Sequence, residues 1–429
     1  MKYVSTKGSI NPVSFREAVM QGLASNGGLF VPAHPVKMPG NFLKEFRGLT
    51  KIDLAVQVIQ PFVGNDLSKD ELKSICEWAW DFDCPLVQVE QDVYCLELFH
   101  GESNAFKDFG ARFLSQCVQH FSKDIQKKKV LLTATSGDTG GAVAASFANV
   151  KDVDVVILYP SKRVSKVQEL QLITGGKNIH AVEVDGDFDR CQQLVKESLG
   201  DCELQKVYHF LSANSINVAR WISQQAYYWF ALQQWREQTR PIISVPSGNL
   251  GNVTAGLLAQ QAGLPIEGFI VACNSNDSVT RYFSNGHFDP LPTIQTLSNA
   301  MDVGNPNNFP RLNQLMKESV LKEGITSRSI SDLDTMNAIR EVGKQCDYHL
   351  EPHGAVAYSA LKHYLDQNVE AKGFFLGTAH PVKFMEIVSP LVDRPIEVPS
   401  SIKDLHLKKQ EKVYLEKNTP LQPLLMQLI

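Results

Sequence analysis

From about residue 130 onward the chain repeats one pattern of apolar and polar positions. A short apolar run is followed by a turn of Gly, Ser or Asn and then by a stretch with helical periodicity. The clearest runs are residues 130–133, 153–159, 242–245 and 374–376. Apolar runs of this length without alternation are typical of strands buried on both faces of a parallel sheet. The pattern therefore predicts an α/β fold with open, mainly parallel sheets flanked by helices.

The two ends of the chain differ from this region. Pro and Gly punctuate the first part of the sequence, which predicts an N-terminal cap domain over residues 1–92. After Pro390 the pattern becomes polar and is interrupted by Pro, which predicts a peripheral C-terminal extension over 391–429. A chain of 429 residues exceeds the length at which one core usually keeps growing. We expect two or three domains that share one site.

Charge and composition narrow the class of partner. The net charge of -4 comes from 42 basic and 46 acidic residues mixed along the chain, which creates no extended field for nucleic acid or an anionic membrane. The mean hydropathy of -0.15 indicates an ordinary soluble protein, and the first ten residues contain no apolar core of signal-peptide length. We expect a cytoplasmic enzyme or binding protein with small-molecule ligands.

Cysteine and histidine spacing indicates no metal site. The eight cysteines include no C-x-x-C pair and are interpreted as buried thiols in a reducing compartment. Among the eleven histidines, only His349 and His353 have H-x-x-x-H spacing, and no H-E-x-x-H motif occurs. His100, His353 and His380 are expected to be structural hydrogen-bonding residues.

A glycine-rich turn follows the apolar run at 242–245. Residues 247–252 read Ser-Gly-Asn-Leu-Gly-Asn and open a helix of small residues, so free backbone N–H groups there can surround an anion. No Lys-Ser or Lys-Thr follows the glycines, which excludes a Walker loop, and the spacing differs from the dinucleotide fingerprint. An ordinary tight strand–helix turn explains these six residues equally well.

A second turn, residues 135–141, has the same setting. Two hydroxyls and several amides converge there and can hold a carboxylate or a phosphate. The alternative is a capped helix start with Ser or Asp as the N-cap. Two such turns in one chain predict a ligand, or a pair of ligands, with two anionic ends.

Lys107 is the candidate nucleophile. It lies in Asn-Ala-Phe-Lys-Asp-Phe-Gly at residues 104–110, between two aromatic residues. A lysine in apolar surroundings is more easily deprotonated and becomes a usable amine nucleophile. Taken alone, the seven residues also fit a solvated surface lysine.

Several segments, in order, resemble the fold-type II pyridoxal-phosphate enzymes, the group of tryptophan synthase β, and within it the threonine synthases. The resemblance covers nearly the whole chain. It rests on residues 15–18, 22–23, 27–32, 97–101, 105–110, 133–140, 212–217 with Arg220, 247–252, 297–303, 305–310, 351–357 and 376–381.

The resemblance implies a role for each matched residue. Lys107 carries pyridoxal 5'-phosphate as a Schiff base, and Thr378 faces the pyridine nitrogen. The other implied cofactor-binding residues are Asp138, Ser247, Gly248, Asn249, Leu250, Gly251 and Asn252. The implied substrate-binding residues are Ser136, Gly137, Thr139, Asn214, Ser215 and Arg220, with Lys162, Arg163 or Lys177 as further candidates for the substrate phosphate.

The same resemblance implies the domains that carry the site. Residues 93–129 and 236–390 form the larger domain, with the Schiff-base lysine and the phosphate loop. Residues 130–235 form the smaller domain, with the substrate loop. Two positions depart from the pattern, because Asp138 replaces the Asn usual in the wider superfamily and Gly354 stands where we expect Ala.

The implied activity is that of a carbon–oxygen lyase acting on phosphate. O-phospho-L-homoserine and water become L-threonine and phosphate by γ-elimination and β-addition of water, the last step of threonine biosynthesis. A fold-type II threonine or serine dehydratase and a non-catalytic relative that binds the cofactor are the alternatives. A second phosphate site around Asn214, Ser215 and Arg220 favours the first reading. The sequence leaves monomer and homodimer undecided.

Overall fold

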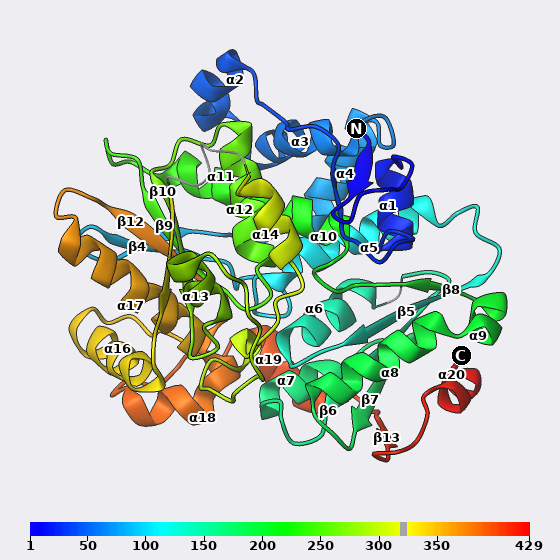
Figure 1. Ribbon diagram of the computed structural model, residues 1–429. Helices are drawn as coiled ribbons and strands as arrows, with labels where there is room; N and C mark the ends of the chain where they lie inside the picture. The colour runs from blue at the N-terminus through cyan, green and yellow to red at the C-terminus, as the bar shows by residue number, and fades with distance from the viewer. Residues whose placement is uncertain (149, 318–323) are drawn as a thin grey trace.

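The computed structural model describes residues 1–148, 150–317 and 324–429. Two β-sheets lie side by side, each with helices against its faces, and the N-terminal segment packs on top of them (Figure 1). The α/β architecture with mainly parallel sheets, expected from the apolar runs, is confirmed. Among the described residues, no helix combines the length and the apolar character needed to cross a bilayer.

The large sheet contains six strands in the described residues, in the order β11-β10-β9-β12-β4-β3. Its strands are β3 (Leu86–Glu90), β4 (Val93–Glu97), β9 (Ile242–Pro246), β10 (Gly268–Cys273), β11 (Ile325–Ser329) and β12 (Gly373–Gly377). All neighbours pair in parallel except the edge strand β3, which is antiparallel to β4. Every residue of β9, β10 and β12 is buried, because helices cover both faces.

In the part of the chain that the structure describes, the small sheet contains five parallel strands in the order β13-β7-β6-β5-β8. Its strands are β5 (Lys128–Ala134), β6 (Val153–Pro160), β7 (Ile179–Val184), β8 (Tyr208–Leu211) and β13 (Val413–Leu415). The strands predicted at residues 130–133, 153–159, 242–245 and 374–376 are confirmed, within β5, β6, β9 and β12.

Helices of the described residues fall into three groups by position. The N-terminal segment has α1 (Phe15–Gln21), α2 (Gly40–Glu45), α3 (Lys51–Val63) and α4 (Lys69–Ala79), with a two-stranded antiparallel sheet of β1 (Tyr3–Ser5) and β2 (Phe30–Pro32). Around the small sheet are α6 (Asp138–Phe147), α7 (Lys166–Ile173), α8 (Phe188–Gly200), α9 (Cys202–Val207) and α20 (Gln422–Leu428). The remaining helices are α5 (Lys107–Phe121), α10 (Val218–Ser223), α11 (Gln225–Gln234), α12 (Gly251–Ala262), α13 (Ser278–Asn285), α14 (Phe309–Leu315), α16 (Asp332–Gln345), α17 (Pro352–Gln367), α18 (Met385–Val388) and α19 (Ser400–Lys403).

Helix α5 connects these parts. It packs on α1 and α4 of the N-terminal segment, on α10, and on α6 of the small sheet. The largest apolar cluster is continuous through these contacts and includes Phe15, Phe109 and Trp221. Helix α5 starts at Lys107, so the candidate nucleophile sits at the junction of all three parts.

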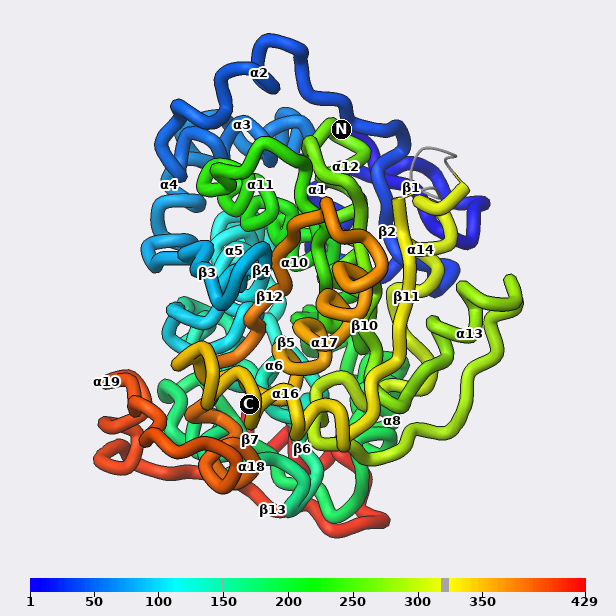
Figure 2. The backbone as a smooth tube through the Cα atoms, turned by 90° about the vertical axis from the view of Figure 1, so that its left-hand side faces the viewer, coloured from blue at the N-terminus to red at the C-terminus, as the bar shows by residue number. Residues whose placement is uncertain are grey.

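The N-terminal and C-terminal segments each contribute one edge strand to a sheet. Strand β3 lies within the 1–92 range but pairs with β4 of the large sheet. The C-terminal strand β13 extends the small sheet beside β7, below the rest of the molecule in Figure 2. The division into a cap, two α/β domains and an extension stays a prediction.

Candidate active site

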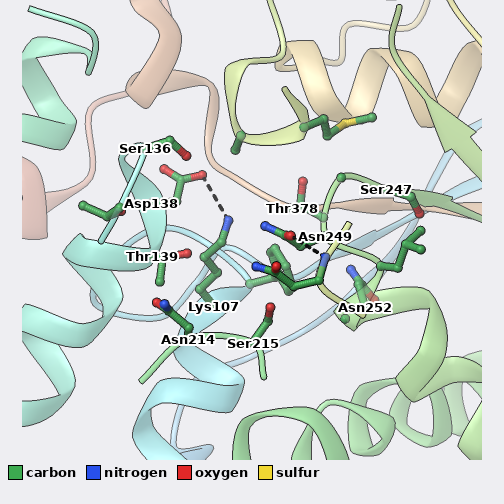
Figure 3. A pocket seen from close by; sticks show the side chains of 18 of the residues that line it. Lys107, Ser136, Asp138, Thr139, Asn214, Ser215, Ser247, Asn249, Asn252 and Thr378 are labelled. Atoms are coloured by element: carbon green, nitrogen blue, oxygen red, sulfur yellow. Dashed lines mark hydrogen bonds and ion pairs between the residues drawn. The ribbon is translucent and has the colours of Figure 1, made fainter. Parts of the chain in front are cut away.

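A cavity opens between the two sheets, at the carboxyl ends of β5, β9 and β12. This is the edge where open parallel sheets bind ligands. Figure 3 shows Lys107 from α5 in the middle of this cavity, with Thr378 on one side and Asp138 and Thr139 on the other. The cavity encloses about 970 Å³ of space between protein atoms, a figure that includes open solvent at its mouth.

Of the implied cofactor- and substrate-binding residues, leaving aside the three further candidates for the substrate phosphate, all but Gly137 line this cavity. The described lining includes Lys107, Ser136, Asp138, Thr139, Asn214, Ser215, Arg220, Ser247, Gly248, Asn249, Leu250, Gly251, Asn252 and Thr378. Gly137 lies outside the described lining and packs against Gln168, where an added Cβ would come within 2.4 Å of a side-chain carbon. Lys162 and Arg163 line a separate surface hollow beside β7, and Lys177 lines neither.

Lys107 is held in a mixed environment of aromatic and charged groups. Its Nζ lies 4.8 Å from the centre of the Phe106 ring and 3.9 Å from Oδ2 of Asp138, and its side chain is 16% exposed. Burial lowers the pKa of Lys107 to about 8; the nearby Asp138 opposes this shift, whereas the cations Arg220 and Lys383 add to it. An amine with this pKa is a competent nucleophile and base near neutral pH.

Asp138 is paired with a cation that the sequence motifs did not single out. Lys383 is fully buried, and its Nζ lies 3.0 Å from Oδ1 of Asp138. Gln168 donates a second hydrogen bond to the same oxygen at 2.9 Å. Burial alone would raise the pKa of the Asp138 carboxyl, but Lys383 and Lys107 outweigh burial and hold it well below its usual value. Asp138 is therefore ionised, and its charge is balanced within the protein.

The turn at residues 135–141 differs from a helix start capped by Ser or Asp. Helix α6 begins at Asp138, and its N-cap, Gly137, has a φ of 136° and no side-chain capping bond. Thr135 instead accepts the N–H groups of Gly137 at 3.0 Å and Gly140 at 2.8 Å through its hydroxyl. The Ser136 and Thr139 side chains are left facing the cavity (Figure 3).

The turn at residues 247–252 forms a cradle at the start of α12. Leu250 has a left-handed backbone with a φ of 62°, and a Cβ added to Gly248 would lie 2.8 Å from the Cα of Met301. Asn252 Nδ2 is buried and has no hydrogen-bond partner among the described residues. Both Tyr227 and Tyr228 donate hydrogen bonds of 2.6 Å to Oδ1 of Asn252, which fixes the amide with its nitrogen free. A helix N-terminus with an unpaired buried donor fits a phosphate.

A second set of polar groups lies on α10 and on the loop before it. Ser215 accepts a 3.0 Å hydrogen bond from Asn308, and Asn214 accepts one of 2.6 Å from Thr133. Arg220 is 2% exposed, bonds the Ala213 carbonyl through Nη1, and its Nε has no partner among the described residues. A buried guanidinium with an unpaired donor beside a cavity is suited to an anion.

Thr378 is connected to a buried carboxylate that sequence motifs did not assign. Its hydroxyl donates to Oε1 of Glu351 at 3.4 Å, and Glu351 also accepts the backbone N–H of Gly354 at 2.8 Å. The ring of His353 lines the cavity; its Nε2 accepts the Ala300 N–H at 3.1 Å, so Nδ1 carries the hydrogen toward Glu351. In the sequence, residues 351–357 were matched to the family, but the match did not assign a role in the site to Glu351 or His353.

The other two histidines of the matched segments have structural contacts. His100 pairs with Glu97 at 2.7 Å near the surface. His380 accepts the N–H of Val382 at 3.1 Å and caps the turn Pro381–Phe384, and burial lowers its pKa to about 4. Both fit the expectation of a hydrogen-bonding role outside catalysis.

The described residues fit pyridoxal phosphate on the points that its chemistry requires. Lys107 supplies an amine with a lowered pKa, Asn252 supplies an unpaired donor in a phosphate cradle, and Thr378 supplies a hydroxyl in the same cavity. Such a group of lysine, cradle and hydroxyl is what the cofactor's aldehyde, phosphate and ring nitrogen need from a protein.

Comparison with known proteins agrees with this fit. Residues 83–374 match the family described as pyridoxal-phosphate dependent enzyme, and residues 2–80 match the threonine synthase N terminus. The chain is 44% identical to threonine synthase of Escherichia coli over 409 residues, which cover 94% of each chain.

Solved structures give the same result. The crystal structure of threonine synthase from Escherichia coli matches with a TM-score of 0.94 and 41% identity over 100% of both chains. The crystal structure of PLP-bound threonine synthase from Brucella melitensis matches with a TM-score of 0.92 and 30% identity, over 100% of this chain and 98% of that one. The chain therefore belongs to the threonine synthase family of pyridoxal-phosphate-dependent enzymes.

Proposed function

We propose that this chain converts O-phospho-L-homoserine and water into L-threonine and inorganic phosphate, with pyridoxal phosphate held on Lys107. The observation that carries the proposal is a pair of unpaired buried donors, Asn252 Nδ2 and Arg220 Nε, in the one cavity that contains Lys107. One donor suits the cofactor phosphate and the other suits a phosphate on the substrate. We place the reaction in the cytoplasm.

The bound cofactor supplies an electron sink for the charge that develops at the substrate α-carbon. Lys107 removes the α-proton as a neutral amine and returns a proton to the carbon skeleton, a role that its lowered pKa permits. The hydroxyls of Ser136 and Thr139 and the N–H groups of that loop orient the substrate carboxylate. The Thr378 hydroxyl holds the ring nitrogen, and the Glu351 carboxylate behind it keeps the hydroxyl oriented.

Arg220, Asn214 and Ser215 hold the phosphate ester at the γ-carbon. The β-carbon loses a proton, the γ-carbon–oxygen bond breaks, and a double bond forms between the β- and γ-carbons. The phosphate leaves with the electrons of the broken bond, and the Arg220 guanidinium balances its charge. Water then adds its hydroxyl to the β-carbon, and the γ-carbon gains a proton to become the methyl group of threonine. Different residues around the cavity thus bind the substrate carboxylate, bind its phosphate and transfer its protons.

Product analysis tests the proposal. The purified protein with pyridoxal phosphate should release phosphate and threonine from O-phosphohomoserine in equal amounts, and it should form little ammonia or keto acid from serine or threonine. The opposite preference would identify a dehydratase, and absence of both activities would identify a non-catalytic relative.

Replacement of Arg220 tests the phosphate contact. Arg220→Ala should lower kcat/KM for O-phosphohomoserine by about 10- to 100-fold, because a hydrogen bond to a charged group contributes about 1.5–3 kcal/mol. Arg163→Ala, in the separate hollow beside β7, is the matched control and should leave kcat/KM unchanged. Equal effects of the two substitutions would remove Arg220 from the site.

A further inference from the structure

Lys383 is a fully buried cation whose contacts are all made within the protein. It lies on the turn Pro381–Phe384, outside the described cavity lining, and its side chain is 0% exposed. Its ammonium lies 3.0 Å from Oδ1 of Asp138 and donates to the Ser103 carbonyl at 2.8 Å and to Gln171 Oε1 at 2.7 Å. These three partners use all three donors of an ammonium group.

The Asp138 carboxylate lies between two lysines. One oxygen, Oδ1, receives Lys383 and Gln168, whereas the other, Oδ2, lies 3.9 Å from Nζ of Lys107. Both partners of Oδ1 are hydrogen-bond donors: Gln168 lies on α7, and Lys383 lies on the turn Pro381–Phe384. This arrangement leaves the second oxygen directed at the Lys107 amine (Figure 3).

We propose that Lys383 is a positioning residue for the reactive amine: it fixes Asp138 as an oriented anion, so that Lys107 can lose its proton without leaving a lone buried carboxylate. The inference rests on the proposed role of Lys107 and goes beyond it, because Lys383 touches neither the amine nor the cavity. A buried carboxylate needs a cation close by. While Lys383 supplies that cation, Lys107 is free to become neutral.

The charged groups around Lys107 and Lys383 determine how removal of Lys383 changes the pH at which Lys107 loses its proton. Lys107 is faced by Asp138 and Glu351, which favour its protonated form, and by Arg220 and Lys383, which disfavour it. Asp138 is faced in addition by His353, and Asp108 faces Lys383. Without Lys383, the protonated Lys107 becomes the main cation available to Asp138. The amine then holds its proton to higher pH.

The test measures Lys107 itself rather than turnover. The full-length protein, freed of cofactor, is labelled with trace acetic anhydride at a series of pH values, and mass spectrometry follows acetylation of the Lys107 peptide. In Lys383→Met the midpoint should rise by about one pH unit or more, as expected when an opposite charge lies within a few ångströms and is no longer shared. In Lys383→Arg, which keeps the charge, the midpoint should stay near its original value.

A second background separates positioning from simple repulsion between cations. In Asp138→Asn the carboxylate that Lys383 would orient is absent, so adding Lys383→Met should move the midpoint much less than it does beside Asp138. Equal shifts in the two backgrounds, or no shift in either, would overturn the proposal.

Folding provides a further check. Lys383→Met strands a buried carboxylate and can prevent folding, whereas the double variant Asp138→Asn/Lys383→Met removes both charges and should fold. Failure of the double variant to fold would show that Lys383 serves the fold alone, which contradicts the inference. Since labelling requires neither cofactor nor substrate, failure of the proposed reaction would leave this result unaffected.

Discussion

Arg311 Nη2 donates a hydrogen bond of 2.9 Å to the backbone carbonyl of Phe30, and this contact ties the N-terminal segment to the active-site loops. The guanidinium is fully buried, stacks 4.1 Å from the Trp221 ring, and makes five hydrogen bonds, all to amide carbonyl oxygens. Two of these acceptors, Ser215 and Asn308, belong to the network around the cavity. One cation therefore orders three segments that are far apart in the sequence.

Arg311→Lys should destabilise the protein by about 2–5 kcal/mol, because an ammonium has three donors for the four oxygens that accept from Arg311 and leaves buried carbonyls unpaired. Denaturant unfolding measures this change. Arg236→Lys, at an exposed arginine, is the control and should change stability by no more than about 0.5 kcal/mol. Similar values for the two variants would show that the Arg311 network contributes little.

The two tyrosines behind Asn252 should control cofactor affinity through the phosphate. The double variant Tyr227→Phe/Tyr228→Phe frees the Asn252 amide to rotate, so the cradle loses a correctly directed donor. We expect affinity for pyridoxal phosphate to fall about tenfold, equivalent to about 1.4 kcal/mol. Tryptophan fluorescence titration measures it. Pyridoxal, which lacks the phosphate, should bind both proteins equally, and a parallel loss for both ligands would refute this role.

Asp108 should make stability fall as pH rises from about 4 to about 6. Its carboxyl is buried, and burial raises its pKa to about 6 from an ordinary value of 3.8. The folded state therefore binds a proton more tightly than the unfolded state, and the resulting stabilisation is complete below the unfolded pKa and is lost through the folded pKa. The shift corresponds to about 3 kcal/mol at most.

Asp108→Asn removes this titration. Unfolding free energies measured at several pH values should show the stability of the variant rising relative to the original protein between about pH 4 and 6, with a constant difference above that range. A difference that does not depend on pH would mean that the Asp108 carboxyl titrates alike in the folded and unfolded chains.

Gly354 is a position where a larger residue should be tolerated. It lies in the first turn of α17, and an added Cβ would meet Glu351 Oε1 at 3.4 Å and a Phe375 ring carbon at 3.9 Å, both ordinary contacts. Gly354→Ala should raise stability by about 0.4–1 kcal/mol by restricting the unfolded chain. A lower melting temperature would instead mean that the Glu351 carboxylate cannot adjust to the methyl group.

Local patterns were sufficient for the central strands and the loops that follow them. The runs at 242–245 and 374–376 are buried on both faces, so their composition identifies them, and the turn at 247–252 needs its glycine for a close backbone approach. These features are encoded by neighbouring residues. The resemblance to the fold-type II enzymes, rather than these local patterns, predicted that Lys107, the phosphate loop and Thr378 share one site.

Partners distant in sequence were beyond the reach of those patterns. Asp138 begins α6, and it meets Lys383 because α7 packs against both α6 and the turn Pro381–Phe384. The short strand β13 joins the small sheet only through β7. The residues next to a lysine in the sequence do not show whether its side chain is buried or solvated. The role of Asp138 became definite only with its cation in place.

Borohydride reduction of the cofactor-loaded protein, followed by peptide mass spectrometry and product assay on the same sample, most directly tests whether Lys107 carries the cofactor for threonine synthesis. The pyridoxyl-phosphate mass should appear on the Lys107 peptide. In Lys107→Ala that mass should be absent, and release of phosphate and threonine should be lost while the circular dichroism spectrum is unchanged. Cofactor trapped on another lysine, or full turnover in Lys107→Ala, would contradict it.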